Sequence, residues 1–135
     1  MLNRMIVKAR PQFPDFFLRD YTKEYIRDPL EVHLYLVSKV EGTIIGHVMG
    51  TLIGTVTNSV SINQLEVSVK YRNKRICSTV LIPSFVRLTE FAETYDLVNT
   101  GKENSCKCYK NAFGKLRYEY DPECSVYMIF KKKRV

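Results

Sequence analysis

The 135-residue sequence has no tryptophan, only two histidines and no apolar run long enough to cross a membrane. Residues 1–13 lack the apolar core of a secretory signal peptide, so we expect an intracellular, cytoplasmic protein. Six glycines and five prolines are too few for a collagen-like or low-complexity chain. With 45% hydrophobic and 26% charged residues, residues 1–135 are expected to fold as a single globular domain.

Acidic residues are also scarce, with 14 carboxylates against 21 lysines and arginines and a net charge of +7. This excess favours anionic partners, which include nucleic acids, acidic surfaces and phosphorylated cofactors. The charge does not choose among these classes.

Cysteine and histidine give little support for a metal site. The four cysteines, Cys77, Cys106, Cys108 and Cys124, are expected to be thiols in an intracellular chain. Cys106 and Cys108 form a C-x-C pair, but zinc sites usually add a second pair of ligands. The histidines, His33 and His47, are distant from that pair and are interpreted as structural, so no metal is predicted.

The most informative stretch changes character in its middle. Apolar and polar residues alternate over residues 62–69, which predicts a strand. Apolar residues then recur at spacings of three and four, which predicts an amphipathic helix, at Leu81, Phe85, Leu88, Ala92 and Tyr95. A strand therefore leads into a helix that we expect Ser78 or Thr79 to cap.

A basic turn lies between this strand and this helix. It contains Lys70, Arg72, Lys74 and Arg75. Because a helix begins with unpaired N–H groups and the positive end of its dipole, added cations there are unfavourable unless an anion binds. The turn is therefore either a phosphate site or a solvated basic surface.

The other segments complete an α+β or α/β pattern with a mixed sheet. We expect further strands at residues 5–8, 32–40, 43–57, 96–100, 115–120 and 125–131, and helices at residues 16–27 and 103–112. Turns are expected at Glu41-Gly42 and Asn58-Ser59. Three glycines, Gly46, Gly50 and Gly54, interrupt residues 43–57 and indicate a bulge, a bend or a close approach.

This order of elements, with the basic turn before the main helix, resembles the GCN5-related N-acetyltransferase (GNAT) family over nearly the whole chain. The family's phosphate motif is Gln/Arg-x-x-Gly-x-Gly/Ala, and its counterpart here is Arg72-Asn73-Lys74-Arg75-Ile76-Cys77. GTIIGHVMG at residues 42–50 is similar to the family's second and third strands. The resemblance implies a central mixed, mostly antiparallel sheet flanked by helices, with a phosphate-binding turn between the fourth strand and the third helix.

The resemblance also implies a cofactor, acetyl-coenzyme A, and positions that bind it. The fourth strand would hold the pantetheine arm through Leu65, Glu66 and Val67. The pyrophosphate would bind the turn formed by Arg72, Asn73, Lys74, Arg75, Ile76, Cys77 and Ser78. An amine would attack the thioester directly, which requires a base and an acid for the departing thiolate.

Two positions depart from the family's phosphate motif, because Arg75 and Cys77 replace its glycines. Glycine permits close backbone approach and unusual dihedral angles, both of which a β-carbon restricts. The Arg75 side chain either crowds the pyrophosphate or forms an ion pair with it. Pro83 also falls near the first turn of the main helix, where it removes about one hydrogen bond.

Two residues are candidates for proton transfer. Tyr109 is the nearest match to the tyrosine that serves as general acid in the family, although Ala112-Phe113 replaces the usual Gly-Phe. Its alternative role is an aromatic anchor for the short helix. Glu66 is the candidate base, and its alternative is a solvent-facing strand residue.

The sequence as a whole predicts an N-acetyltransferase that transfers an acetyl group from acetyl-coenzyme A to an unidentified primary amine. One alternative is a degenerate cofactor-binding or regulatory module, which the loss of both motif glycines favours. Another is a small basic nucleic-acid-binding domain, which is considered less consistent with the pattern. No membrane partner is expected, and the oligomeric state is undetermined.

Overall fold

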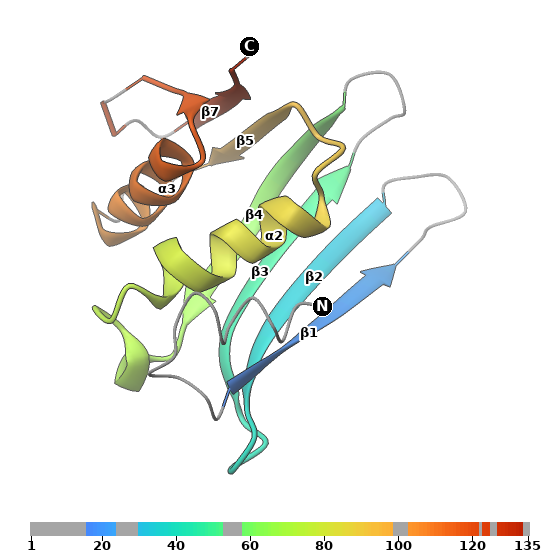
Figure 1. The fold of residues 1–135 in the computed structure, drawn as a ribbon, viewed down its shortest axis with the longest axis vertical. Helices are drawn as coiled ribbons and strands as arrows, with labels where there is room; N and C mark the ends of the chain where they lie inside the picture. Colours follow the sequence, from blue (N-terminus) through green and yellow to red (C-terminus); the bar gives the residue numbers. More distant parts are fainter. Residues whose placement is uncertain are drawn as a thin grey trace.

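The computed structural model describes residues 16–23, 30–52, 58–98, 103–121, 123–124 and 127–133. Its elements follow in the order β1 (Phe16–Lys23), β2 (Leu30–Ser38), β3 (Ile44–Leu52), β4 (Ser59–Val67), the 3-10 turn η1 (Val69–Tyr71), the π-helical turn η2 (Cys77–Leu81), α2 (Ile82–Leu88), β5 (Thr94–Val98), α3 (Glu103–Lys115), β6 (Tyr118–Glu119) and β7 (Tyr127–Lys132) (Figure 1).

The strands form one mixed sheet in the order β1-β2-β3-β4-β5-β7-β6. Every neighbouring pair in this sheet is antiparallel except β4 and β5, which are parallel. The connection between those two strands carries η2 and α2. The prediction of a mixed, mostly antiparallel sheet is therefore confirmed.

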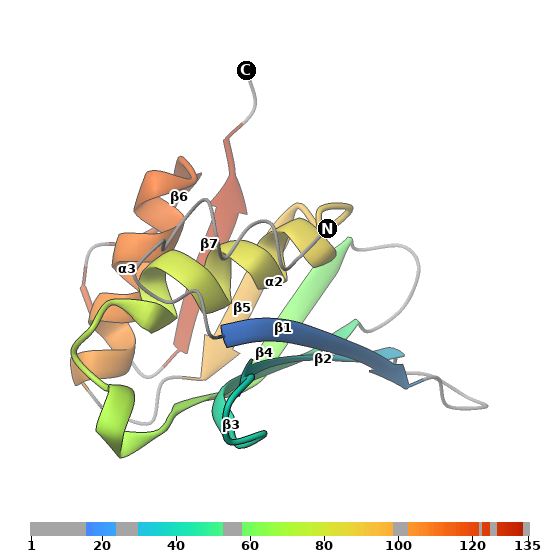
Figure 2. The ribbon, with the colours of Figure 1, turned by 60° about the horizontal axis from the view of Figure 1, so that its bottom comes forward.

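The helices pack on one face of the sheet, and the opposite face of the described strands carries the more exposed side chains. Figure 2 shows α2 lying over the curved sheet formed by β1 to β4. Alternate strand residues enter the core beneath the helices, among them Leu34, Val48, Ile62, Tyr95 and Phe130. Period-two burial of this kind is what strand geometry imposes when only one face is covered. We call the other side, which no helix of the described residues covers, the open face.

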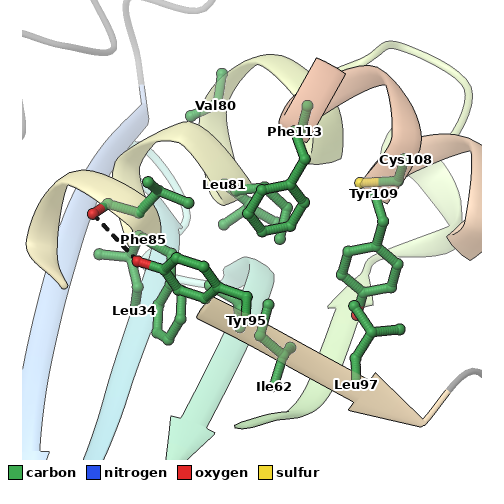
Figure 3. Packing of buried hydrophobic residues seen from close by; sticks show 14 of the residues in the cluster. Leu34, Ile62, Val80, Leu81, Phe85, Tyr95, Leu97, Cys108, Tyr109 and Phe113 are labelled. Carbon is green, nitrogen blue, oxygen red and sulfur yellow. Dashed lines mark hydrogen bonds between the residues drawn. The ribbon is translucent and has the colours of Figure 1, made fainter. Parts of the chain in front are cut away.

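The core is continuous from α2 to α3. Figure 3 shows Phe113 of α3 and Phe85 of α2 on either side of Tyr95. The buried hydroxyl of Tyr95 lies 2.6 Å from Thr89 Oγ1 and donates to the Thr89 carbonyl at 3.0 Å. Because this polar group has hydrogen-bond partners, its burial carries little of the usual cost.

The predicted helix over residues 16–27 is wrong, because residues 16–23 form strand β1. Phe17 and Tyr21 fit a helical spacing, but Phe16 and Leu18 fit a strand and are both buried. Pairing with β2 along the whole of β1 decides between the two periods, as tertiary contacts often do. The strand expected at residues 5–8 lies outside the described residues.

The other expected elements exist with shifted boundaries. The helix expected from Leu81 to Tyr95 ends at Leu88, because Tyr95 belongs to strand β5, and Ser78 and Thr79 lie inside the helical segment instead of capping it. α3 continues to Lys115, so β6 is confined to Tyr118–Glu119. The strand expected at residues 43–57 begins at Ile44 and is described to Leu52, and Gly54 lies outside the described residues. Pro83 stands in the first turn of α2, directly after the π-helical turn, and the helix continues beyond it as expected.

Two glycines of β3 let the helical segment approach the sheet. A β-carbon on Gly46 would lie 2.7 Å from Leu81 Cδ1, and one on Gly50 would lie 2.6 Å from Phe85 Cζ. The pairing with β4 also shifts register between Met49 and Gly50. Both readings of these glycines, irregularity and close approach, are thus confirmed.

Replacing Gly50 with alanine should lower the free energy of unfolding by about 1–3 kcal/mol, because the new methyl group would overlap Phe85 and Val60. Gly114→Ala is the matched control, since its β-carbon meets only the hydroxyl end of Tyr120 at 3.1 Å. Urea unfolding of the two variants checks the prediction. Equal stability of both variants would contradict the close packing at Gly50.

Candidate functional site

The central feature of the site is a length of β4 that extends beyond its pairing with β5. The parallel pairing runs from Ser59 opposite Thr94 to Ile62 opposite Leu97. The next residue, Asn63, is extra in the register between β4 and β3. Among the described residues, 64–67 of β4 pair only with β3, and Asn63 is paired with neither β3 nor β5.

Such a strand edge can bind an extended ligand. Along a strand, backbone N–H and C=O groups point alternately to its two neighbours. The groups of residues 63–67 on the side away from β3 are therefore placed to pair with an extended chain, as a further strand would. Leu65 and Val67 are half-buried against the core, whereas Glu66 is exposed on the open face.

The basic turn follows this edge directly. Arg72 Nε donates a 2.9 Å hydrogen bond to the carbonyl of Val67, so the turn is fixed to the end of β4. The Lys70 and Lys74 ammonium groups lie 5.7 and 5.6 Å from the centre of the Tyr71 ring. These contacts hold several cations around the start of the helical segment.

Arg75 has the backbone conformation of a glycine. Its φ is 60°, and that of Asn73 is 62°, both in the left-handed region. A non-glycine residue in this region costs on the order of 1 kcal/mol. The Arg75 carbonyl nevertheless accepts a 3.0 Å hydrogen bond from the Thr79 amide, which begins the helical segment. Arg75 therefore keeps the path of the chain that the motif glycine allows.

The other residues of the turn divide into exposed and buried ones. Arg72, Asn73, Lys74 and Arg75 are exposed. Ile76 and Ser78 are buried, at 1% and 6% exposure, so their side chains face the core and only their backbone groups could bind an anion. Such amides at the start of a helical segment lack acceptors within it.

Tyr109 lies in the core rather than on an exposed surface. Its side chain is 5% exposed, and its ring centre is 6.3 Å from that of Phe130. Figure 3 shows its ring projecting from α3 toward Leu97 of β5. Burial raises the pKa of Tyr109 well above its ordinary value, so the hydroxyl keeps its proton at neutral pH.

No protein family model and no curated protein sequence matches the chain. Solved structures do match. A spermidine N-acetyltransferase from Vibrio cholerae, in complex with CoA and spermine, superposes with a TM-score of 0.55 at 14% identity, over 75% of this chain and 66% of that one. The chain thus spans about two thirds of that protein's length.

Two further acetyltransferases superpose comparably. An aminoglycoside acetyltransferase in complex with coenzyme A and kanamycin gives a TM-score of 0.55 at 15% identity, over 75% of this chain and 66% of that one. A GNAT-family acetyltransferase from Staphylococcus aureus gives a TM-score of 0.54 at 14% identity, over 76% of this chain and 69% of that one. The chain has the GNAT fold.

The expectation that all four cysteines are thiols is wrong. The structure joins Cys77 to Cys108 and Cys106 to Cys124, each pair with Cα atoms 5.9 Å apart. Cys106 and Cys108 are two residues apart on α3, and helical residues at that spacing point in different directions. They therefore meet different partners instead of forming a common metal site.

The Cys77–Cys108 disulfide links the two halves of the proposed GNAT site. Cys77 stands where the resemblance to the family predicts the second glycine of the phosphate motif, and Cys108 precedes Tyr109 on α3. The bond therefore fixes the start of the helical segment relative to the tyrosine. The even number of cysteines was the only sequence signal for this arrangement.

Sequence reasoning also missed a polar cluster on the open face of the GNAT sheet. We call it the imidazole cluster, and it comprises Glu31, His33, Tyr35 and His47. Its signal was present, because strand alternation places Glu31, His33 and Tyr35 on one face of β2. What the sequence did not supply was the hairpin register that sets Tyr35 opposite His47.

Two further classes of site were tested over the described part of the chain. It contains no group of three or more histidine, cysteine, aspartate or glutamate side chains that could hold a metal ion. None of the helices within it has the length and apolar character needed to span a membrane.

Loss of the Cys77–Cys108 bond should lower the free energy of unfolding by about 3–4 kcal/mol, because it closes a loop of 31 residues. The measurement is urea unfolding of a Cys77→Ser/Cys108→Ser double variant. The Cys106→Ser/Cys124→Ser double variant, with a separation of 18, is the matched comparison and should lose about 3 kcal/mol. Four thiols that react under denaturing, non-reducing conditions would contradict both bonds.

Proposed function

We propose that this chain transfers the acetyl group of acetyl-coenzyme A to a primary amine. The observation that carries the proposal is the stretch of β4 at residues 63–67, which has no pairing with β5 among the described residues and leads directly into the basic turn. One site thus offers a strand edge for an extended arm and a cationic helix start for phosphates. The GNAT fold supports the same assignment.

The chain's own groups fit this cofactor. Backbone groups of Leu65, Glu66 and Val67 would pair with the amide-containing pantetheine arm. Backbone amides at Ile76, Cys77 and Ser78 would receive the pyrophosphate.

The exposed side chains of the turn would complete the phosphate site. Arg72 and Arg75 each present a planar guanidinium that can form paired hydrogen bonds with phosphate, and Lys74 and Asn73 add further donors. The left-handed φ of Arg75 preserves close approach of the backbone while its side chain adds charge. We therefore favour an ion pair between Arg75 and phosphate over steric obstruction.

The reaction requires a neutral amine, a carbonyl carbon and a route for two protons. Glu66, exposed on the open face beside the free edge of β4, is the proposed group that takes the first proton from the ammonium. The amine nitrogen then bonds to the thioester carbon, the carbon–sulfur bond breaks, the nitrogen of the new amide gives up its excess proton to restore the proton donor, and the thiolate receives a proton. Tyr109, protonated and beneath α3, is the proposed donor of that proton.

The acceptor is proposed only as a primary amine. Two structural neighbours were solved with spermine and with kanamycin, respectively. The net charge of +7 on this chain favours a neutral or acidic acceptor molecule over a polycation. The substrate therefore need not follow those neighbours.

A cofactor-binding module without catalysis is the second candidate. Two observations favour it: the Tyr109 hydroxyl is buried in the core, and Cys77 is engaged in a disulfide at a motif glycine position.

A cytoplasmic location is likewise a proposal. The two disulfides weigh against it, since such bonds persist mainly in oxidising compartments.

Thermal unfolding with acetyl-coenzyme A tests cofactor binding. At about one hundred times its dissociation constant the ligand should add roughly 2.7 kcal/mol, which raises Tm by several degrees in a domain of this size. Adenosine 3′,5′-bisphosphate, which lacks the pantetheine arm and the pyrophosphate, should give a much smaller shift. If millimolar acetyl-coenzyme A gives no shift, both candidates fail, and salt-dependent nucleic-acid binding becomes the next test.

The same assay decides the role of Arg75. Arg75→Gly keeps the left-handed backbone and removes only the side chain, so it should weaken acetyl-coenzyme A binding about tenfold through loss of a charge-assisted contact. Arg75→Lys retains the positive charge, so its affinity for acetyl-coenzyme A should lie between those of the wild type and the glycine variant. Tighter binding by the glycine variant would show that the arginine obstructs the site.

Turnover numbers of tyrosine variants separate the two candidate functions, acetyl transfer and cofactor binding without catalysis. Tyr109→Phe should lower kcat by about a hundredfold while leaving acetyl-coenzyme A affinity nearly unchanged. Tyr118→Phe is the matched control, because Tyr118 is another buried tyrosine of the same aromatic core, and its kcat should stay unchanged. An equal loss of affinity and turnover in Tyr109→Phe would make this residue structural.

A further inference from the structure

The imidazole cluster lies directly beside the proposed base. His47 on β3 is paired with Tyr35 of β2 on one side and with Glu66 of β4 on the other. Side chains opposite one another in an antiparallel pair have β-carbons about 5 Å apart. The imidazole of His47 and the carboxylate of Glu66 are therefore neighbours on the open face.

A continuous hydrogen-bonded chain leads away from His47. Its Nε2 lies 2.9 Å from Nδ1 of His33, and Nε2 of His33 lies 2.6 Å from Oε1 of Glu31. The three rings of Tyr35, His33 and His47 are within 4° of parallel, and those of Tyr35 and His47 are stacked at 4.3 Å. The stacking holds the imidazoles in one orientation.

The Glu31 carboxylate, at the end of this hydrogen-bonded chain, fixes the position of each imidazole proton. An ionised carboxylate only accepts hydrogen bonds, so His33 must donate from Nε2 to Glu31. In its neutral form His33 then has an unprotonated Nδ1, which accepts from Nε2–H of His47. His47 is left with Nδ1 as its proton-accepting atom.

The surroundings keep His47 neutral. Burial and the neighbouring His33 lower the pKa of His47, and the nearby Glu66 opposes them in part. Each β1 position paired with the cluster is charged or titratable: Arg19 is paired with Tyr35, Tyr21 with His33 and Lys23 with Glu31. A neutral imidazole at physiological pH is competent to accept a proton.

We propose that His47 is a proton-relay residue of the acceptor site, which passes the proton collected by Glu66 through His33 to Glu31. The proposal rests on the acetyl transfer proposed above, and it assigns a role to three residues outside that site. His47 acts through Glu66 and does not itself touch the substrate.

The protons balance across the relay. The ammonium loses one proton to the Glu66 carboxylate, which passes it to Nδ1 of His47. Nε2–H of His47 then protonates Nδ1 of His33, and Nε2–H of His33 protonates Glu31, which releases the proton to water. Glu66 is again a carboxylate, and the neutral amine is free to attack the thioester carbon. The two imidazoles are left in the opposite tautomers and regain the starting ones by exchanging protons with water before the next turnover; no oxidant or reductant is involved.

The hydrogen-bonded chain is tested on the free protein by nitrogen-15 NMR of the imidazoles. His47 should carry its proton on Nε2 and have a pKa lowered from the ordinary histidine value by burial. Glu31→Gln replaces a carboxylate, which only accepts hydrogen bonds, with an amide that can also donate, so it should disturb the tautomer of His33 and, through it, that of His47. Tyr35→Phe is the control, because it retains the stacked ring and loses only a hydroxyl 3.4 Å from His33 Nδ1. A proton on Nδ1 of His47, or no response to Glu31→Gln, overturns the proposal.

The relay itself is tested by the pH dependence of kcat/KM with spermine and n-butylamine as probe acceptors. His47→Gln should lower kcat/KM about tenfold and displace the acidic limb of the profile, with the KM for acetyl-coenzyme A unchanged. A His47→Gln profile that matches the wild type overturns the relay. If the tautomers are as described but acetyl-coenzyme A causes no thermal shift, the proposed function fails, and with it the relay's role.

Discussion

The candidate site depends on where the pairing of β4 with β5 stops. The two strands are parallel neighbours only from Ser59 to Ile62, and the extra residue Asn63 follows at once. On the open face, the Asp96 carboxylate of β5 lies 2.9 Å from Ser61 Oγ of β4 and accepts from the Tyr127 hydroxyl of β7 at 3.2 Å. These bonds hold the strands together immediately before β4 continues without β5, so the free edge begins at a defined place.

The helical segment reaches this edge because the sheet makes room for it. Gly46 and Gly50 lack the β-carbons that would meet Leu81 and Phe85, which lets η2 and α2 lie close to β3 (Figures 1 and 2). The Cys77–Cys108 bond then joins the start of that segment to α3. Strand edge, cationic turn and Tyr109 are thus fixed relative to one another by packing and by a covalent bond.

The sequence predicted the parts of this arrangement that local patterns encode. Alternation over residues 62–69 and helical spacing from Leu81 identified the strand, the turn and the helix, and the glycines of β3 were interpreted correctly. The same spacing extended the helix too far, because Tyr95 lies in β5. Residues 16–23 satisfied two periods at once, and only pairing with β2 selects the strand.

Local sequence patterns could not predict contacts between segments that are distant in the chain. Which cysteines approach within disulfide distance depends on how α3 lies against η2, which no spacing reveals. The pairing of His33 with His47, fourteen residues apart, likewise depends on the register of the β2–β3 hairpin. The left-handed φ of Arg75 was hidden because arginine seldom adopts it, although the position it fills is a glycine in the related motif.

Amide hydrogen exchange with and without acetyl-coenzyme A tests the central claim most directly. If the free edge of β4 and the basic turn hold the cofactor, ligand should slow exchange at the amides of residues 63–67 and 76–78, while β1 and β2 stay unchanged. Protection confined to other parts of the sheet, or none at saturating ligand, would contradict the account.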